Sequence, residues 1–360
     1  MTYMRWAKTH TRVRYELTDS GVPGVERHEF DTLGAPVNLR NIGPYGDPKL
    51  ISALARRYRV AEAGVVPVPG ASSGIFIALA VAANAGAKVL LEQPTYEPIR
   101  LAAEFLHLSI EWLRRDPLHS FDVNPDDIEM GLDEGATAVI LCNLHNPSGR
   151  AIKPEAMRAI VKRCERAHAT LIVDEAYLDA WSLNAEQPCW TAASLGDNVI
   201  AINSLTKIYG LSGLRAGWLA TSPRLADRAR DLMDLLSVNN AAPAMTLAVS
   251  ALHGIGRLEE RFRQLYSAGQ PIFRDWLARE PRVQGYTNDG AIFECIRLPG
   301  GLSGGRLNEL LVSEYDTQVT PGAFFDLDDH IRLSLTLGPD DLTAALTNIS
   351  SGLDRLTRAT

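Results

Sequence analysis

The chain has 360 residues, of which 46% are hydrophobic and 22% are charged, and its formal net charge is −7. This length is enough for one large α/β domain and a smaller one. A net negative charge without a basic stripe argues against a nucleic-acid-binding surface. The longest apolar stretch, around Ile75 to Ala83, is about half as long as a membrane span. We therefore expect no nucleic-acid partner and no insertion into a membrane.

The four cysteines are too few and too scattered for a disulfide framework. They are Cys142, Cys164, Cys189 and Cys295, and none forms a C-x-x-C pair. The first residues, MTYMRWAKTHTRVRYE, are polar and charged, unlike a secretory signal. These features predict reduced cysteines and a cytoplasmic location. We also predict no metal site.

Helical and strand patterns alternate between residues 47 and 235. Apolar residues at Leu50, Ile51, Leu54 and Tyr58 have a helical spacing, which predicts a helix over 47–58. This alternation favours an α/β fold with a mostly parallel sheet and helices on both faces. The other predicted helices cover 72–83, 96–107 and 153–168, and the predicted strands cover 65–69, 87–93, 136–143, 170–175 and 198–204.

The pattern changes after residue 240. A long amphipathic helix is predicted over 257–279, and strands and helices then mix to the end of the chain, which suggests a smaller α+β domain. We predict a large cofactor-binding domain over 41–240 and a small domain made of 1–40 and 241–360. The first forty residues lack a strong period, and we expect them to pack on the small domain or to cover a cleft. The later predicted elements are strands over 283–286, 291–298 and 330–335, a helix over 306–315 and a last helix.

Polar or glycine-rich clusters follow four of the predicted strands, at 70–74, 145–149, 174–177 and 204–207. Each cluster alone has an ordinary structural explanation, such as a helix cap, a turn or a surface charge. In open parallel sheets, however, ligands bind at the carboxyl ends of the strands. Four clusters at one edge therefore predict a shared polar site.

The residues at this edge suit a cofactor that carries a phosphate and an aldehyde. The turn that opens the helix after the first strand offers backbone N–H groups and the Ser72 hydroxyl to a phosphate. Ser204 and Arg215 can complete that site, because a guanidinium forks onto phosphate oxygens. Lys207 can bind an aldehyde as a Schiff base. Asp174 can pair with a pyridinium nitrogen, which keeps the ring an electron sink.

The segment 204–218, SLTKIYGLSGLRAGW, resembles the cofactor-lysine signature of the class I/II aminotransferases, which are fold type I pyridoxal-phosphate enzymes. The resemblance covers the chain from about residue 40 to the end. It implies a fold type I transferase and the cofactor pyridoxal 5′-phosphate. It continues in the family's order through NIGPYGDPKLISALARRY, PGASSG, EQPTYEP, CNLHNPSG, VDEAYLD and PGAFFDLDDHIRLSL.

The resemblance implies a role for each matched residue around the cofactor ring. Lys207 corresponds to the Schiff-base lysine, which later moves a proton between the substrate Cα and the cofactor C4′. Asp174 corresponds to the partner of the pyridine nitrogen. Tyr177 and Asn146 correspond to donors to the phenolic oxygen, and Tyr96 to the aromatic side chain that stacks on the ring.

The resemblance also implies a phosphate site and a dimer. Ala71 and Ser72 correspond to backbone donors to the phosphate, and Ser204 and Arg215 complete the site. Tyr45 corresponds to a tyrosine that reaches the phosphate of the neighbouring subunit. These matches imply a homodimer with composite active sites.

The substrates implied by the resemblance are an α-amino acid and a 2-oxo acid. Arg332 corresponds to the arginine that binds the α-carboxylate, and Asn146 also faces the substrate. Gly21 matches a backbone contact to that carboxylate, although a plain turn explains it equally well, and Asn239 matches a residue from the partner subunit. Family members that act on acidic amino acids have an arginine just before this asparagine, but 232–244 contains no basic residue. The expected donor is therefore neutral, aromatic or basic rather than acidic.

Three alternatives remain at this point. The same cofactor residues serve lyases, decarboxylases, racemases and oxidases of this fold. The short chain and GLSGLRAG are also similar to histidinol-phosphate aminotransferases and to the related threonine-phosphate decarboxylases. A non-catalytic regulator of this fold would carry an added DNA-binding domain, for which the chain leaves no room. We therefore favour a pyridoxal-phosphate-dependent aminotransferase.

Overall fold

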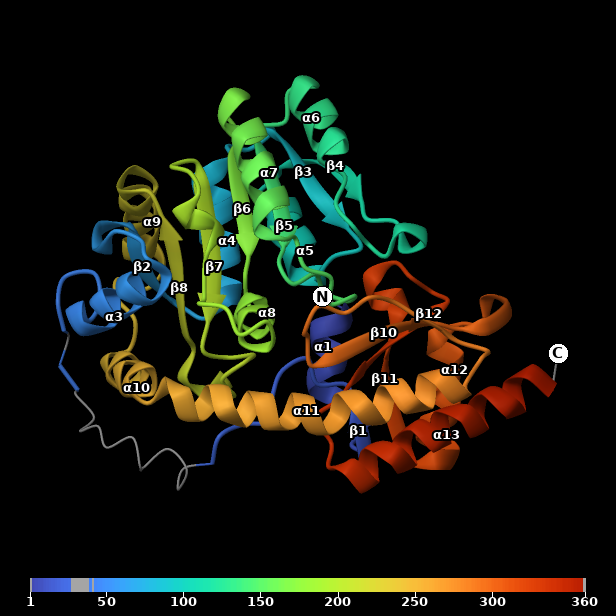
Figure 1. The fold of residues 1–360 in the computed structure, drawn as a ribbon. Helices are drawn as coiled ribbons and strands as arrows, with labels where there is room; N and C mark the ends of the chain where they lie inside the picture. Colours follow the sequence, from blue (N-terminus) through green and yellow to red (C-terminus); the bar gives the residue numbers. More distant parts are fainter. Residues whose placement is uncertain (1, 27–38, 41, 359–360) are drawn as a thin grey trace.

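The computed structural model describes residues 2–26, 39–40 and 42–358, and it contains two β-sheets with helices packed around them (Figure 1). The larger sheet has the strand order β2-β8-β7-β6-β5-β3-β4. β8 is antiparallel to both of its neighbours, and all other adjacent strands are parallel. The predicted, mostly parallel α/β sheet is thus confirmed. Its strands are β2 (Val65–Pro69), β3 (Lys88–Gln93), β4 (Ser109–Arg114), β5 (Ala138–Cys142), β6 (Thr170–Asp174), β7 (Val199–Ser204) and β8 (Ala216–Thr221).

Helices cover both faces of this sheet, which explains why its central strands are apolar without interruption. In β5, Ile140 and Cys142 pack into the core beneath helix α4, whereas Val139 and Leu141 pack into the core on the opposite face. The two cores hold the sheet rigid, so the loops at its carboxyl edge start from fixed positions. The helices of this part are α3 (Pro48–Tyr58), α4 (Ala71–Ala82), α5 (Glu97–Phe105), α6 (Pro125–Asp133), α7 (Pro154–Arg166), α8 (Leu178–Asn184), α9 (Pro223–Leu236) and α10 (Ala242–His253).

The smaller sheet has the order β1-β11-β12-β10-β9 and joins the start of the chain to its end. β1 pairs in parallel with β11, and the other neighbours are antiparallel. Apolar side chains from α11 and α13 pack against this sheet. The strands are β1 (Tyr15–Leu17), β9 (Gln284–Gly285), β10 (Phe293–Arg297), β11 (Thr317–Pro321) and β12 (His330–Ser334), and the helices are α1 (Thr2–Thr9), α11 (Ile255–Arg279), α12 (Gly304–Tyr315) and α13 (Pro339–Arg358).

The long helix α11 runs past both sheets (Figure 1). Its first half contributes Leu258 and Phe262 to a core that also contains Tyr58 of α3 and Trp218 of β8. Its second half contributes Phe273 to the core of the smaller sheet. The division into 41–240 and 1–40 with 241–360 stays a prediction. No helix within the described ranges has the length and apolar character that crossing a membrane requires.

Candidate active site

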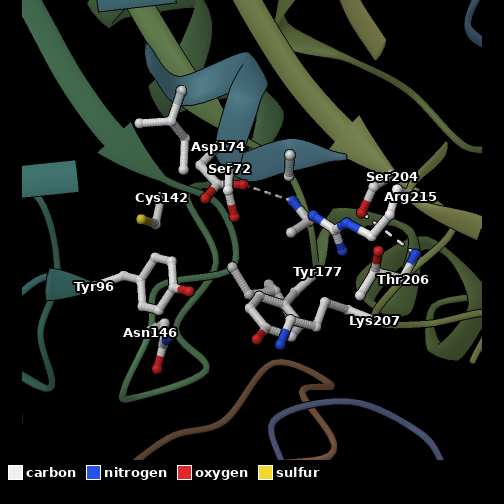
Figure 2. Close-up of a pocket in the computed structure, with 14 residues that line it drawn as sticks. Ser72, Tyr96, Cys142, Asn146, Asp174, Tyr177, Ser204, Thr206, Lys207 and Arg215 are labelled. Carbon is white, nitrogen blue, oxygen red and sulfur yellow. Dashed lines mark hydrogen bonds between the residues drawn. The ribbon is translucent and has the colours of Figure 1, made fainter. Parts of the chain in front are cut away.

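A pocket of about 560 Å³ lies at the carboxyl edge of the larger sheet, where the four polar clusters meet (Figure 2). The predicted edge is correct because β2, β5, β6 and β7 all run in the same direction. Nine of the residues named from the sequence line the pocket: Ala71, Ser72, Tyr96, Asn146, Asp174, Tyr177, Ser204, Lys207 and Arg215.

One end of the pocket is built to receive an anion. Helix α4 begins at Ala71 without a side-chain cap, so its N-terminal N–H groups and its dipole face the pocket. Gly70 has φ +81°, and a Cβ there would lie 2.3 Å from Arg215 Nη2. Only glycine therefore lets the guanidinium approach the helix start. Thr206 Oγ1 is buried without a hydrogen-bond partner and also borders this end.

Asp174 ends β6 and points its carboxylate into the pocket (Figure 2). Its Oδ1 accepts a hydrogen bond from the Ala176 N–H at 3.1 Å. Burial raises the pKa of this carboxyl to about 6, with Glu92 adding to the rise and the Ala176 N–H and Lys207 opposing it. A buried carboxylate with one weakly satisfied oxygen can hold a cationic ring nitrogen.

Lys207 lies in the loop after β7, against the N-terminal segment of the chain. Its Nζ donates to Ser20 Oγ at 2.7 Å, and its backbone oxygen accepts from the Val22 N–H at 2.9 Å. A Cβ at Gly21 would lie 2.9 Å from the Lys207 backbone oxygen. Gly21, named from the sequence, is thus required for close packing against the lysine.

Two tyrosines border the pocket as neutral groups. Burial raises the pKa of both Tyr96 and Tyr177 above the ordinary tyrosine value. Both hydroxyls therefore keep their protons at neutral pH and can donate hydrogen bonds. In Figure 2, Tyr96 and Asn146 face Lys207 across the pocket.

Arg332 adjoins the pocket from β12 of the smaller sheet, and it is 1% exposed. Its Nη1 donates to Asn146 Oδ1 at 2.9 Å, and its Nη2 donates to the Thr18 backbone oxygen and to the Tyr3 hydroxyl, each at 3.1 Å. All of these acceptors are neutral, and Arg332 Nε is buried without a partner. Within the described residues no carboxylate pairs with this guanidinium. A buried cation without a counter-charge is costly, so the site favours binding of an anion.

Two of the residues named from the sequence lie elsewhere. Tyr45 is 46% exposed, and the Arg230 guanidinium lies 5.6 Å from its ring centroid. Asn239 is half-buried after the end of α9, and its N–H donates to the Ser237 backbone oxygen at 2.5 Å. Neither lines this chain's pocket. Their roles, which the resemblance assigns to a partner subunit's site, stay predictions.

Sequence reasoning missed several residues of this region. Thr206 and Cys142 line the pocket, Ser20 contacts Lys207, and Tyr3 contacts Arg332. Thr206 stands directly before Lys207 in the SLTK segment, so its position could have identified it. Ser20 and Tyr3 belong to the first forty residues, which lack a strong hydrophobic period, so the local sequence did not indicate a role for either of them.

Comparison with known proteins places this arrangement in one family. The family described as aminotransferase class I and II matches residues 16–349. Capreomycidine synthase of Streptomyces vinaceus is 24% identical over 350 residues, which cover 93% of this chain and 90% of that protein. Arginine–pyruvate transaminase of Pseudomonas aeruginosa is 24% identical, over 85% of this chain and 80% of that protein. The chain matches 65% of the length of a histidinol-phosphate aminotransferase of Methanococcus maripaludis, at 23% identity over 69% of this chain.

Solved structures share the fold. A PLP-dependent aminotransferase from Streptococcus suis 89-1591 superimposes with a TM-score of 0.89 at 20% sequence identity, covering 98% of this chain and 96% of that one. An aminotransferase from Mycobacterium tuberculosis gives a TM-score of 0.86 at 22% identity, over 98% and 95% of the two chains. The fold therefore matches the one that the sequence predicts.

Proposed function

The chain belongs to the class I and II aminotransferases, and we propose that it moves the amino group of a neutral, aromatic or basic α-amino acid to a 2-oxo acid. Membership of this family confirms the predicted enzyme class and the predicted cofactor, pyridoxal 5′-phosphate. The observation that carries this proposal is that Lys207 and Asp174 line one pocket, and that the buried Arg332 bonds to Asn146, which also lines it. When bound, the cofactor supplies an aldehyde that captures amino groups and a ring that withdraws electrons from the substrate Cα.

The pocket residues fit both ends of this cofactor. The uncapped start of α4, at Ala71 and Ser72, would bind the phosphate together with Ser204, Thr206 and the Arg215 guanidinium. The unpartnered Thr206 hydroxyl supports this assignment, because a buried hydroxyl without a partner is destabilising until a ligand accepts its proton.

The opposite end suits the pyridine ring. Asp174 would accept a hydrogen bond from the protonated ring nitrogen, and that contact would lower the raised pKa of this carboxyl. Tyr177 and Asn146 would hold the phenolic oxygen, and Tyr96 would cover one face of the ring. These contacts fix the orientation of the ring relative to Lys207.

Lys207 would bind the cofactor's aldehyde and would then move the reacting proton. In this role Lys207 Nζ would take up the reacting proton and give it back when cofactor and substrate are bound. Ser20 Oγ accepts a hydrogen bond from Nζ at 2.7 Å and so would orient the amine. The close packing of Gly21 on the Lys207 backbone holds the loop in place.

Arg332 would bind the substrate α-carboxylate. Its planar fork suits two parallel hydrogen bonds to a carboxylate, and its only partners here are neutral acceptors that an anion can displace. The side-chain preference is supported by residues 232–244, which hold no basic residue that could pair with an acidic side chain.

We also propose that the active unit is a homodimer. Tyr45 is exposed, and Leu235, Leu236 and Val238 form an exposed apolar patch near the end of α9. Exposed apolar residues gathered in one segment are typical of an interaction surface. In the dimer, Tyr45 and Asn239 would reach the partner's pocket. A cytoplasmic location is part of the same proposal, supported by the four free cysteines.

A half-reaction screen tests the proposal. The purified holoenzyme is mixed with each amino acid, the absorbance of the lysine-bound cofactor is followed, and the product is identified by mass spectrometry. We expect loss of that absorbance together with the matching 2-oxo acid. Capreomycidine synthase, whose name is not that of an aminotransferase, matches most of the chain. A product other than the 2-oxo acid would therefore favour the alternative, other pyridoxal-phosphate chemistry on an amino acid.

A further inference from the structure

Helix α1 is fixed against the start of α5, beside the pocket. The buried Glu97 carboxylate accepts hydrogen bonds from the N–H groups of Thr2, Tyr3 and Met4, at 2.8, 3.1 and 3.5 Å. These N–H groups have no partners within their own helix, so a carboxylate from α5 replaces the usual cap. The neighbouring Tyr96 hydroxyl donates to Met4 Sδ at 3.1 Å. The first turn of α1 is thereby held next to the residue that borders the cofactor site.

Tyr3 is the residue of α1 that this arrangement buries, at 6% exposure. Its ring lies 5.4 Å from that of Phe324, 5.8 Å from that of Phe325 and 6.0 Å, edge-on, from that of Tyr96. Aromatic contacts on several sides leave the ring little freedom to rotate out. The position of the Tyr3 hydroxyl is therefore set by packing and not by a flexible side chain.

The Tyr3 hydroxyl is hydrogen-bonded to the guanidinium of Arg332. Arg332 Nη2 donates to the hydroxyl oxygen at 3.1 Å, so the oxygen acts as an acceptor and its own proton is left for another group. No hydrogen bond donated by this hydroxyl is found among the described residues. Burial opposes ionisation of Tyr3, but Arg332 and Lys207 outweigh it and lower the pKa of the hydroxyl, which makes it a stronger donor.

We propose that Tyr3 is a substrate-binding residue, whose hydroxyl donates a hydrogen bond to the α-carboxylate that docks on Arg332. This inference rests on the proposed function, because it assigns the anion of that site as the carboxylate of the amino acid. The donors are then Arg332 from the small sheet and Tyr3 from the N-terminal helix. Because α1 is fixed to α5 through Glu97, carboxylate binding connects the small sheet to the large one.

Tyr3→Phe tests the inference, since it removes the hydroxyl and keeps the ring that packs against Phe324. A hydrogen bond to a charged group contributes about 1.5–3 kcal/mol, so we expect the KM for the amino donor and for the 2-oxo acid to rise about tenfold or more. The kcat and the absorbance of the bound cofactor should change little. The matched control is Tyr15→Phe, which removes a tyrosine hydroxyl on β1, outside the pocket lining.

A second readout separates binding from structure. We compare kcat/KM for an amino acid with that for the amine of the same side chain, which lacks the carboxylate. Tyr3→Phe should lower the first value and leave the second nearly unchanged. An equal loss for both substrates, or an unchanged KM, would overturn the inference.

The third readout does not depend on turnover. The unreactive carboxylate 3-phenylpropionate is titrated into the holoenzyme, and its Kd is read from the cofactor absorbance. We expect a Kd about tenfold higher for Tyr3→Phe than for the native chain. Equal Kd values would refute the role of Tyr3 even if transamination is established. Weaker binding by the variant would support that role even if the reaction proves to be of another kind.

Discussion

Lys207 Nζ lies 2.7 Å from the hydroxyl oxygen of Ser20, a residue 187 positions earlier in the chain. The contact continues through the backbone, where the Val22 N–H donates to the Lys207 carbonyl. Residues 18–22 therefore run along the lysine loop and reach it from the small sheet. Lys207 therefore lies where the loop after β7 meets the segment that leaves β1 of the smaller sheet.

Replacement of this lysine should stop the reaction without unfolding the protein. Lys207→Ala removes the amine that we propose binds the cofactor and moves the proton, and it only shortens one side chain of the pocket lining. We expect no measurable turnover, an unchanged circular dichroism spectrum and no covalent label after borohydride treatment. In the native protein the label should be found on Lys207, and a label on a different lysine would contradict the assignment.

Replacement of Asp174 should lower the rate more than cofactor affinity. Asp174→Asn keeps the shape of the side chain but removes the charge that stabilises a protonated ring nitrogen. We expect kcat to fall by several powers of ten, about 1.4 kcal/mol for each, while the Kd of the cofactor changes less. Stopped-flow half-reactions and cofactor titration measure the two quantities. A near-native rate would rule out this role for Asp174.

Shortening Arg332 should weaken the binding of every amino acid. Arg332→Lys keeps a positive charge but loses the planar fork and the bonds to Asn146 and Thr18. We expect KM to rise about tenfold or more for all donors, with a smaller effect on simple amines. Steady-state kinetics over a donor series checks this. In the same series aspartate should not be the best donor, and if it is, the predicted side-chain preference is wrong.

A charge on the exposed apolar patch should disrupt the dimer. Leu235 is 82% exposed on α9, close in sequence to Asn239. Leu235→Glu should give a monomer with little activity, because Tyr45 would no longer reach the partner's pocket. Met130→Glu, at an exposed position of α6, is the matched control and should change neither property. Light scattering and activity are measured on the same samples. A fully active monomer would refute the composite site.

Glu175 should make the stability of the fold depend on pH. Burial raises the pKa of this carboxyl from an ordinary 4.5 to about 8, although the Ala192 N–H and the Thr191 side chain oppose the rise. The folded state thus keeps a proton that the unfolded chain loses above pH 4.5, so stability falls as the pH rises from 4.5 to 8. Glu175→Gln should raise the Tm more at pH 8.5 than at pH 5. Equal shifts at both pH values would contradict the assigned pKa.

Much of the cofactor site could be predicted from local sequence. Alternating apolar strands and helices predict a parallel sheet, and a parallel sheet brings the ends of its strands to one edge. Asp174 stands at the end of one such strand and Lys207 shortly after another, so the alternation of strands and helices in the sequence already predicts that they meet in one pocket. The predicted helix over 47–58 was confirmed as α3 for the same reason, since its apolar spacing is strong.

Other elements depended on tertiary contacts. Strands β1, β4, β8 and β11 were not predicted. β1 has only three residues and β4 is largely exposed, whereas β8 and β11 are buried along their whole length, and all four pair with strands elsewhere in the chain. The antiparallel direction of β8 has no local signal either. The loop over 205–215 joins the two strands, Arg215 takes φ 51° at its end, and β8 then pairs antiparallel with β7.

The sequence by itself determined the family and the cofactor, and it identified nine residues that line the pocket, because these residues stand in short motifs close to the ends of periodic strands. Only the tertiary structure decided what surrounds Arg332. Tyr3 and Arg332 are 329 residues apart, and they meet because β1 pairs with β11 and because Glu97 holds α1 against α5. Contacts across such separations arise from sheet pairing and burial. The local sequence around a single residue does not predict these contacts.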